Sequence, residues 1–227
     1  GVLMSPLCTS GAIAVGVDPS DVALRASEEQ GWPLFQNYFN EKVAEQILGK
    51  YGAARIVVGN NVFAHVDDIH AIVRGVTVLL EEDGVFIFEV HYQGDLINSL
   101  QFDTVYHEHV CYYSLTSLVR LLSQHELKVV DVSRIPIHAG SIRVIAARST
   151  SSRTTSLGVY KMIGEEKELN LERFVDRVQI RRKVLREMIG DLSLAGRHVV
   201  AYGAAGRMTI LLNYCRSEER RVGKECV

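Results

Sequence analysis

The chain has 227 residues, of which 47% are hydrophobic and 23% charged, and its formal net charge is −2. This composition is typical of a folded globular protein with one or two domains. A nearly neutral charge gives no electrostatic reason to expect a nucleic acid or an anionic membrane as partner. No apolar run approaches the ~20 residues of a membrane span and no signal-peptide pattern opens the sequence, so we expect a cytoplasmic protein.

The first 150 residues alternate apolar runs with helical periodicity, which predicts a parallel sheet with helices on both faces. The expected strands are 12–18, 34–35, 55–60, 85–90, 127–132 and 141–147. The expected helices are 19–30, 41–49, one that starts near residue 69 and ends before Asp83, and 115–125. Asp67 is the predicted N-cap of the third helix. The last two strands are joined through Pro136 and Gly140, so we expect them to pair antiparallel.

Beyond residue 148 the composition changes. Ser, Thr and Arg dominate 149–155, which indicates a linker between a first domain, 1–150, and a second, 151–215. A long charged helix at 165–189, a strand at 198–202, a glycine-bearing turn at 203–207 and a helix at 208–214 predict the start of a smaller α/β unit. The turn and Arg207 suit phosphate binding, although a tight turn needs glycine for steric reasons alone.

Four cysteines, Cys8, Cys111, Cys215 and Cys226, are widely spaced and form no C-x-x-C pair. Their spacing favours neither a disulfide scaffold nor a zinc site. We interpret them as reduced thiols.

The densest group of proton-handling side chains is Tyr106, His107, Glu108 and His109, which follows the strand at 85–90. Side chains that titrate near neutral pH are costly to bury, and acid–base catalysis is one function that requires them. His107 and His109 would share one face of a strand, which is compatible with a metal site, but no third ligand stands at a typical spacing. The pattern therefore favours proton transfer over metal binding.

Polar residues also follow two predicted strands. Asp18 ends one strand, where a nucleoside-binding sheet places an acid against ribose hydroxyls, but a helix-capping role is equally compatible with its position. Asn60 and Asn61 end another strand, at the sheet edge where open α/β folds bind ligands. Tyr112 and Tyr113 are interpreted as core packing residues.

Segments 60–68, 83–90 and 106–115, followed by 135–144 and 202–215, carry a resemblance to a known family. They resemble class I S-adenosylmethionine-dependent C-methyltransferases, and more closely the deoxysugar C-3 methyltransferases that act on nucleotide-linked 4-keto sugars. The resemblance extends from Gly1 to about Cys215. It implies a Rossmann-like methyltransferase sheet, mostly parallel with an antiparallel last strand, then part of a second, smaller Rossmann-like α/β unit. The implied cofactor is S-adenosylmethionine and the implied substrate a small molecule, a nucleotide sugar.

The resemblance also implies residue roles. His109 would be the base that removes the sugar C-3 proton, with Tyr106 and Glu108 lining the same pocket; an unperturbed histidine titrates near ~6.5, which suits this task. The implied cofactor-binding residues are Asp18 at the ribose, Tyr38 and Phe39 beside the adenine, and Asn60 and Asn61 near the methionine end. The implied substrate-binding residues are Asn61, His65 and Arg207.

Some family features have no counterpart in this sequence. The resemblance places a Gly-rich cofactor loop immediately before residue 2, and an N-terminal zinc domain with paired cysteines before that loop. We therefore expect a fragment that binds S-adenosylmethionine poorly, with zinc only in the missing domain. Residues 216–227 depart from the family and resemble a translated sequencing adapter, so no function is expected of them. Two alternatives are a nicotinamide-dependent oxidoreductase, favoured by Asp18 and the turn at 203–206, and an inactive fragment.

Overall fold

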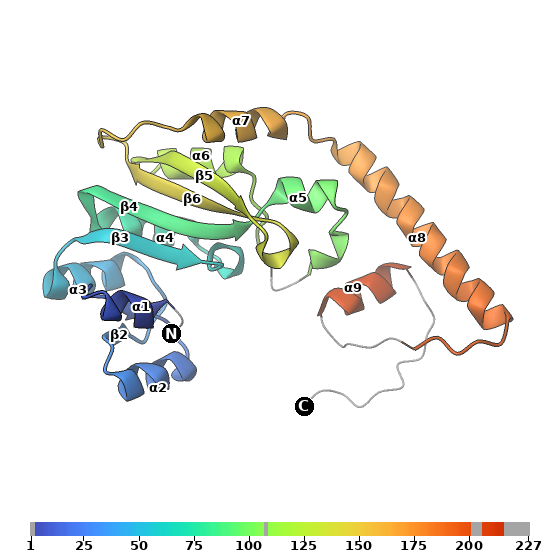
Figure 1. The fold of residues 1–227 in the computed structure, drawn as a ribbon, viewed down its shortest axis with the longest axis horizontal. Helices are drawn as coiled ribbons and strands as arrows, with labels where there is room; N and C mark the ends of the chain where they lie inside the picture. The colour runs from blue at the N-terminus through green and yellow to red at the C-terminus, as the bar shows by residue number, and fades with distance from the viewer. Residues whose placement is uncertain (1–2, 107–108, 201–205, 216–227) are drawn as a thin grey trace.

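The computed structural model describes residues 3–106, 109–200 and 206–215 (Figure 1). The helices are α1 (Met4–Thr9), α2 (Asp21–Gln30), α3 (Glu41–Tyr51), α4 (Ile69–Leu79), α5 (Gln93–Asn98), α6 (Leu115–Ser123), α7 (Leu157–Glu166), α8 (Leu171–Leu194) and α9 (Gly206–Cys215). The strands are β1 (Gly16–Val17), β2 (Leu34–Phe35), β3 (Ala54–Asn60), β4 (Leu80–His91), β5 (Leu127–Ile135) and β6 (Ser141–Arg148). Three short 3₁₀ helices are η1 (Phe63–His65), η2 (Phe102–Thr104) and η3 (Ile137–Ala139).

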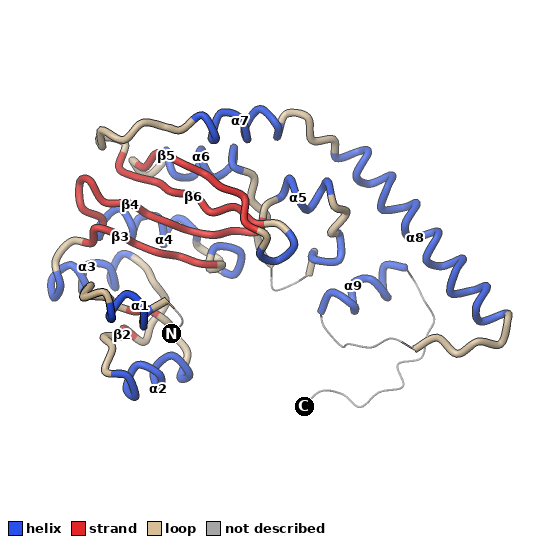
Figure 2. Tube along the Cα trace, in the orientation of Figure 1, coloured by secondary structure: helices blue, strands red, loops and turns tan. Residues whose placement is uncertain are grey.

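The main sheet has the strand order β3-β4-β6-β5 (Figure 2). β3 and β4 are parallel, and β6 is antiparallel to both β4 and β5. Three of the four strands therefore run in one direction and the last strand in the chain runs against them. This arrangement confirms the predicted α/β sheet, mostly parallel with an antiparallel last strand. β1 and β2 form a separate parallel pair.

The hydrophobic core lies between the sheet and helices α4 and α6, which Figure 1 shows behind it. Ile72, Val73 and Val76 of α4 are buried at the predicted three- and four-residue spacing, against Phe86 and Phe88 of β4. Burial of each such side chain contributes roughly 1.5–3 kcal/mol, which is why α4 forms despite its three valines and other β-branched residues.

The opposite face of the sheet is only partly covered. Ile56 and Val58 of β3 are 57% and 40% exposed, in contrast with the prediction of helices over both faces. Val57, between them, points to the other side and packs against the core. The alternation places one row of β3 side chains in the core and the other row in contact with solvent.

Several predicted boundaries were wrong. The first strand covers two residues instead of seven, because β1 has only the two-residue β2 as its partner. The N-cap of α4 is Asp68 instead of Asp67, since the Asp68 carboxylate accepts a hydrogen bond of 3.0 Å from the Ala71 N–H. The predicted helix at 165–189 is two helices, α7 and α8. Asn170 separates them and caps α8 by accepting from the Arg173 N–H at 2.8 Å.

The C-terminal part is helical where the structure describes it. Residues 198–200 are not in a strand, in contrast with the prediction, and 201–205 lie outside the described residues. Between 151 and 200 and from 206 to 215 the chain forms only helices, so the second α/β unit stays a prediction. Figure 1 shows α8 running away from the sheet and α9 returning toward η2, and α9 contacts both.

Candidate active site

The predicted acid–base residues lie beyond the carboxyl ends of β3 and β4. The η1 turn, which carries His65, follows β3, and α5 and η2 follow β4. Parallel strands that end side by side present their following loops at one edge of the sheet, where open α/β folds bind ligands. A hydrogen bond of 2.9 Å from the Val110 N–H to the Ala64 carbonyl joins the two loops.

His109 has a defined hydrogen-bonding partner. Its Nδ1 lies 2.9 Å from the Thr104 carbonyl oxygen. Because a carbonyl oxygen can only accept, the proton of the neutral imidazole sits on Nδ1 and the lone pair is on Nε2. A neutral histidine held in this tautomer is suited to remove a proton through Nε2.

Three further rings surround His109. The ring centroids of Tyr106, His65 and Tyr112 lie 4.6, 5.3 and 6.0 Å from that of His109. The structure therefore brings together His109, Tyr106 and His65, as predicted from the sequence. Glu108, the other predicted catalytic residue, lies outside the described residues, as does His107.

The two following tyrosines have different environments. Tyr113 is buried and donates to the Phe63 carbonyl at 2.9 Å, and burial raises the pKa of its hydroxyl well above the usual value. This confirms its interpretation as a core residue. Tyr112 is half-buried and donates to the Thr104 carbonyl at 2.9 Å, beside His109, and burial also raises the pKa of its hydroxyl. Both phenols are therefore protonated donors at neutral pH.

Gln101 and Thr104 lie in the loop before His109 and were not predicted from the sequence to be functional. Gln101 is buried; its amide donates to the Ala139 carbonyl at 2.8 Å and its Oε1 accepts from His91 Nε2 at 3.0 Å. Thr104 donates its hydroxyl to the Gln101 carbonyl at 2.7 Å. These bonds fix the loop whose carbonyl orients His109. Neutral polar residues in a loop have no sequence pattern that would identify this role.

The predicted cofactor residues occupy the ends of β1 and β3. Asn60 is the last residue of β3, and Asn61 follows with a left-handed φ of 53°. Its N–H donates to the Glu89 carbonyl at 3.0 Å, which turns the chain toward η1. Asp18 is exposed, and its Oδ1 accepts from the N–H and hydroxyl of Ser20 at 2.9 and 2.6 Å. Ser20 is the N-cap of α2, so Asp18 supports a helix start without being the cap itself.

The predicted adenine residues differ in exposure. Tyr38 is 71% exposed, whereas Phe39 is half-buried and packs against both parts of the hydrophobic core. Together with Asp18, Asn60 and Asn61, these side chains offer a carboxylate, an exposed aromatic ring and two amides, which are groups that fit a nucleoside with an amino-acid tail.

Arg207, the predicted phosphate contact, pairs with Asp103. Its Nε and Nη2 donate to the two carboxylate oxygens at 2.8 and 3.0 Å. The preceding residue, Gly206, faces the Tyr106 ring, and a Cβ there would lie 3.6 Å from it. Arg207 therefore lies next to the candidate active site, although it comes from the C-terminal part of the chain.

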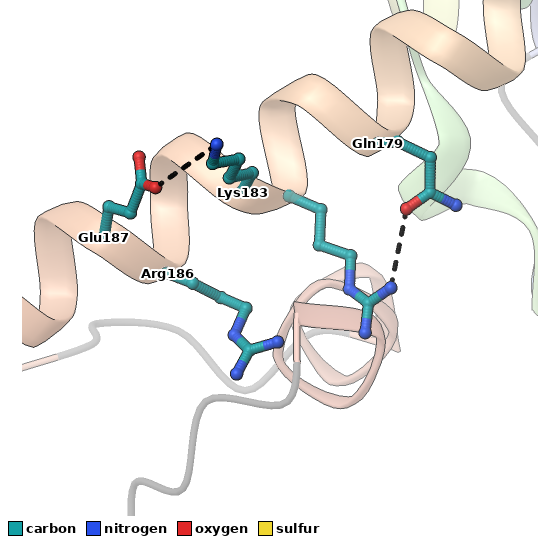
Figure 3. Close-up of a pocket in the computed structure, with 5 residues that line it drawn as sticks. Gln179, Lys183, Arg186 and Glu187 are labelled. Atoms are coloured by element: carbon teal, nitrogen blue, oxygen red, sulfur yellow. Dashed lines mark hydrogen bonds and ion pairs between the residues drawn. The ribbon is translucent and has the colours of Figure 1, made fainter.

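Two cavities lie away from these residues. One, of about 430 Å³, is lined along α8 by Gln179, Arg182, Lys183, Arg186 and Glu187 (Figure 3). A second, of about 360 Å³, lies between α4 and the end of α6. Neither includes a predicted site residue. Among the described residues there is no group of three or more potential metal ligands, and no helix is long and apolar enough to cross a membrane.

Comparisons with known proteins define the class of this fold. Residues 1–132 match the family model described as a methyltransferase domain. Residues 136–223 match the model described as a C-methyltransferase C-terminal domain. The first model covers more than half of the chain, so the chain belongs to the methyltransferases, and its C-terminal part matches a domain of C-methyltransferases. Both models are of methyltransferases, and the oxidoreductase alternative is not favoured.

Among curated proteins, the chain is similar to the C-methyltransferase NovU of Streptomyces niveus, with 37% identity over 212 residues. The match covers 91% of this chain and 50% of that protein, so the chain spans about half the length of its relative. Among solved structures, PH0226 of Pyrococcus horikoshii OT3 has a TM-score of 0.49 and 12% identity, covering 65% of this chain and 77% of that one. An S-adenosylmethionine-dependent methyltransferase of Clostridium acetobutylicum has a TM-score of 0.48 and 14% identity, and the match covers 65% of this chain and 80% of that one.

Proposed function

We propose that the protein to which this chain belongs transfers a methyl group from S-adenosylmethionine to a carbon next to a ketone, with His109 as the base. The observation that carries the proposal is the bond from His109 Nδ1 to the Thr104 carbonyl, which leaves the Nε2 lone pair for proton abstraction. The family membership supports the reaction class.

The chemistry requires a carbanion, and a proton beside a ketone is its accessible source. His109 Nε2 takes this proton, and the electron pair of the C–H bond moves onto the ketone oxygen to form an enolate. Tyr106 and His65, which lie beside His109, are candidate donors to the enolate oxygen. When bound, S-adenosylmethionine would supply an electrophilic methyl group to the enolate carbon, and its sulfur would keep the electrons of the broken S–C bond. His109 retains the proton until solvent removes it.

The cofactor contacts belong to the same proposal. Asp18 would hold the ribose hydroxyls through Oδ2, because Oδ1 is taken by Ser20. Tyr38 presents an exposed ring for the adenine, beside Phe39. The amides of Asn60 and Asn61, at the end of β3, would contact the methionine end. These groups match the hydrogen-bonding pattern of the cofactor.

The substrate in this proposal is a nucleotide-linked 4-keto deoxysugar, methylated at C-3. Asn61 and His65 would contact the sugar, and Glu108 would line the same pocket. The Asp103 carboxylate uses Nε and Nη2 of Arg207, which leaves Nη1 for the diphosphate. Residues 1–150 would form the cofactor domain and 151–215 the start of the domain that carries this arginine.

Hydrogen exchange tests the proposed base separately from methyl transfer. The full-length gene product is incubated in D₂O with nucleotide-linked 4-keto sugars in the presence of S-adenosylhomocysteine, and C-3 deuteration is followed by NMR. We expect exchange that depends on His109, and, with S-adenosylmethionine, a product methylated at C-3. Methylation on oxygen or nitrogen would contradict the proposal.

Calorimetric titration tests the cofactor. The full-length product is titrated with S-adenosylmethionine and with NAD, and we expect binding of the first only. Binding of NAD without binding of S-adenosylmethionine would overturn the proposal in favour of the oxidoreductase alternative. Binding of neither compound, together with no turnover, would favour an inactive protein.

A further inference from the structure

Asp103 lies in η2, next to Thr104, and takes no part in the proposed proton and methyl transfers. It forms a two-point ion pair with Arg207, 104 residues away in the chain, with N–O distances of 2.8 and 3.0 Å. The Asp103 side chain is 26% exposed and that of Arg207 44%. A planar guanidinium that meets both carboxylate oxygens fixes direction as well as distance.

Two further contacts attach α9 to the same loop. The Phe102 and Tyr214 rings lie 5.5 Å apart between centroids, and Gly206 faces the ring of Tyr106. A Cβ at Gly206 would lie 3.6 Å from that ring, which is van der Waals contact distance, so the α9 backbone runs close to Tyr106. Asp103 therefore joins a continuous contact between α9 and the residues that precede His109.

Helix α9 is in turn attached to α8. The Tyr214 hydroxyl accepts from Gln179 Nε2 at 2.8 Å, and the Arg182 guanidinium lies 5.1 Å from the Tyr214 ring centroid. Tyr214 therefore contacts both α8 and, through the Phe102 ring, η2. The C-terminal helices thus support the candidate active site from outside the sheet.

We infer that the Asp103–Arg207 ion pair is a latch that holds α9 against η2 and Tyr106, and that Asp103 is a positioning residue for His109. The link is short, because the residue after Asp103 is Thr104, whose carbonyl fixes the His109 tautomer. Tyr106, which faces Gly206, also lies beside His109, with a ring-centroid distance of 4.6 Å. The inferred effect on turnover rests on the proposed function, whereas the effect on the His109 ring does not.

A double-mutant cycle on the 227-residue chain tests the latch without an activity assay. Asp103→Asn, Arg207→Gln and the double variant are compared by NMR of the histidine ring carbons, with the His109 signal assigned by its loss in His109→Asn. We expect both single variants to shift the His109 signal, and the Asp103→Asn effect to vanish when Arg207 is already glutamine. Lys183→Gln, which breaks the exposed Lys183–Glu187 pair of α8, is the control and should leave the signal unchanged.

Turnover of the full-length gene product gives the second measurement. We expect Asp103→Asn to lower kcat about tenfold with little change in the cofactor KM, and Asp103→Glu to retain most of the activity. An unshifted His109 signal in Asp103→Asn would overturn the latch, whether or not the melting temperature falls. Shifted signals in a protein without methyl transfer would support the latch and refute the proposed function instead.

Discussion

At the scale of single residues, His109 combines a fixed tautomer with two neighbouring hydrogen-bond donors. Because asparagine keeps a donor near the Thr104 carbonyl and lacks a basic nitrogen, His109→Asn should remove the base with little effect on the loop. We expect turnover of the full-length product to fall by about 10²–10⁴-fold, the usual contribution of a general base. The dissociation constant for S-adenosylmethionine, measured by calorimetry, should hardly change.

A matched control for this variant is His198→Asn, since His198 is exposed and lies outside the candidate site. Its turnover should equal that of the unmodified protein. Full activity in His109→Asn would refute the assigned base.

His125 gives a pH dependence of stability. Its Nε2 lies 2.8 Å from His70 Nδ1. Burial and the positive charges of His70 and Arg74 lower the pKa of His125, and the negative charges of Glu41 and Asp68 offset part of this shift. With the folded pKa below the unfolded value of 6.5, the unfolded chain binds more protons in the interval between them. The free energy of unfolding should therefore fall as pH decreases below 6.5.

Urea unfolding between about pH 7 and about pH 5.5 measures this effect. His125→Gln keeps a hydrogen-bonding group and does not titrate, so part of the pH dependence should disappear. An unchanged slope in His125→Gln would show that other groups account for it.

At the scale of elements, the turn between β3 and η1 requires a left-handed residue. Asn61 has a φ of 53°, a conformation that asparagine and glycine adopt more readily than alanine. We expect Asn61→Ala to lower the free energy of unfolding by about 1 kcal/mol more than Asn61→Gly. Urea unfolding of the two variants measures the difference. Equal stabilities would indicate that the turn relaxes.

Helix α7 caps the start of α6. The Glu166 carboxylate accepts from the Thr116 N–H at 2.9 Å and also from the Leu115 N–H. A negative charge at the N-terminus of a helix is favourable, so Glu166→Gln should lower the free energy of unfolding by about 1 kcal/mol. Glu168→Gln, beyond the end of α7, is the control and should have little effect. Equal losses in both variants would contradict this role.

Local patterns predicted most of these elements. The spacing of Ile72, Val73 and Val76 gave the buried face of α4, and Pro136 with Gly140 indicated the antiparallel pair of β5 and β6. Local patterns could not separate α7 from α8, because the cap at Asn170 is one polar residue among many. They could not give the length of β1 either, since that depends on the neighbouring strand.

At the scale of the whole molecule, the candidate site depends on contacts between distant segments. The density of titratable groups around His109 is visible in the sequence, and the structure brings His65 to it from a different loop. The pairing of Asp103 with Arg207 across 104 residues has no local signature. The sequence therefore predicted that His65, Tyr106 and His109 lie close together, but it could not show how the C-terminal helices contact them.

The exposed face of the sheet determines how the isolated chain should behave in solution. Within the described residues β3 is an edge strand, and its Ile56 and Val58 are 57% and 40% exposed. An edge strand with exposed apolar side chains favours association with another copy.

Light scattering of the 227-residue chain should therefore show association that increases with concentration. Val58→Lys should reduce it, because a lysine on an edge strand opposes pairing, whereas Val105→Lys, which changes an exposed valine away from the sheet, should not. A monomer at all concentrations, or equal association in both variants, would show that another surface governs the behaviour of the chain.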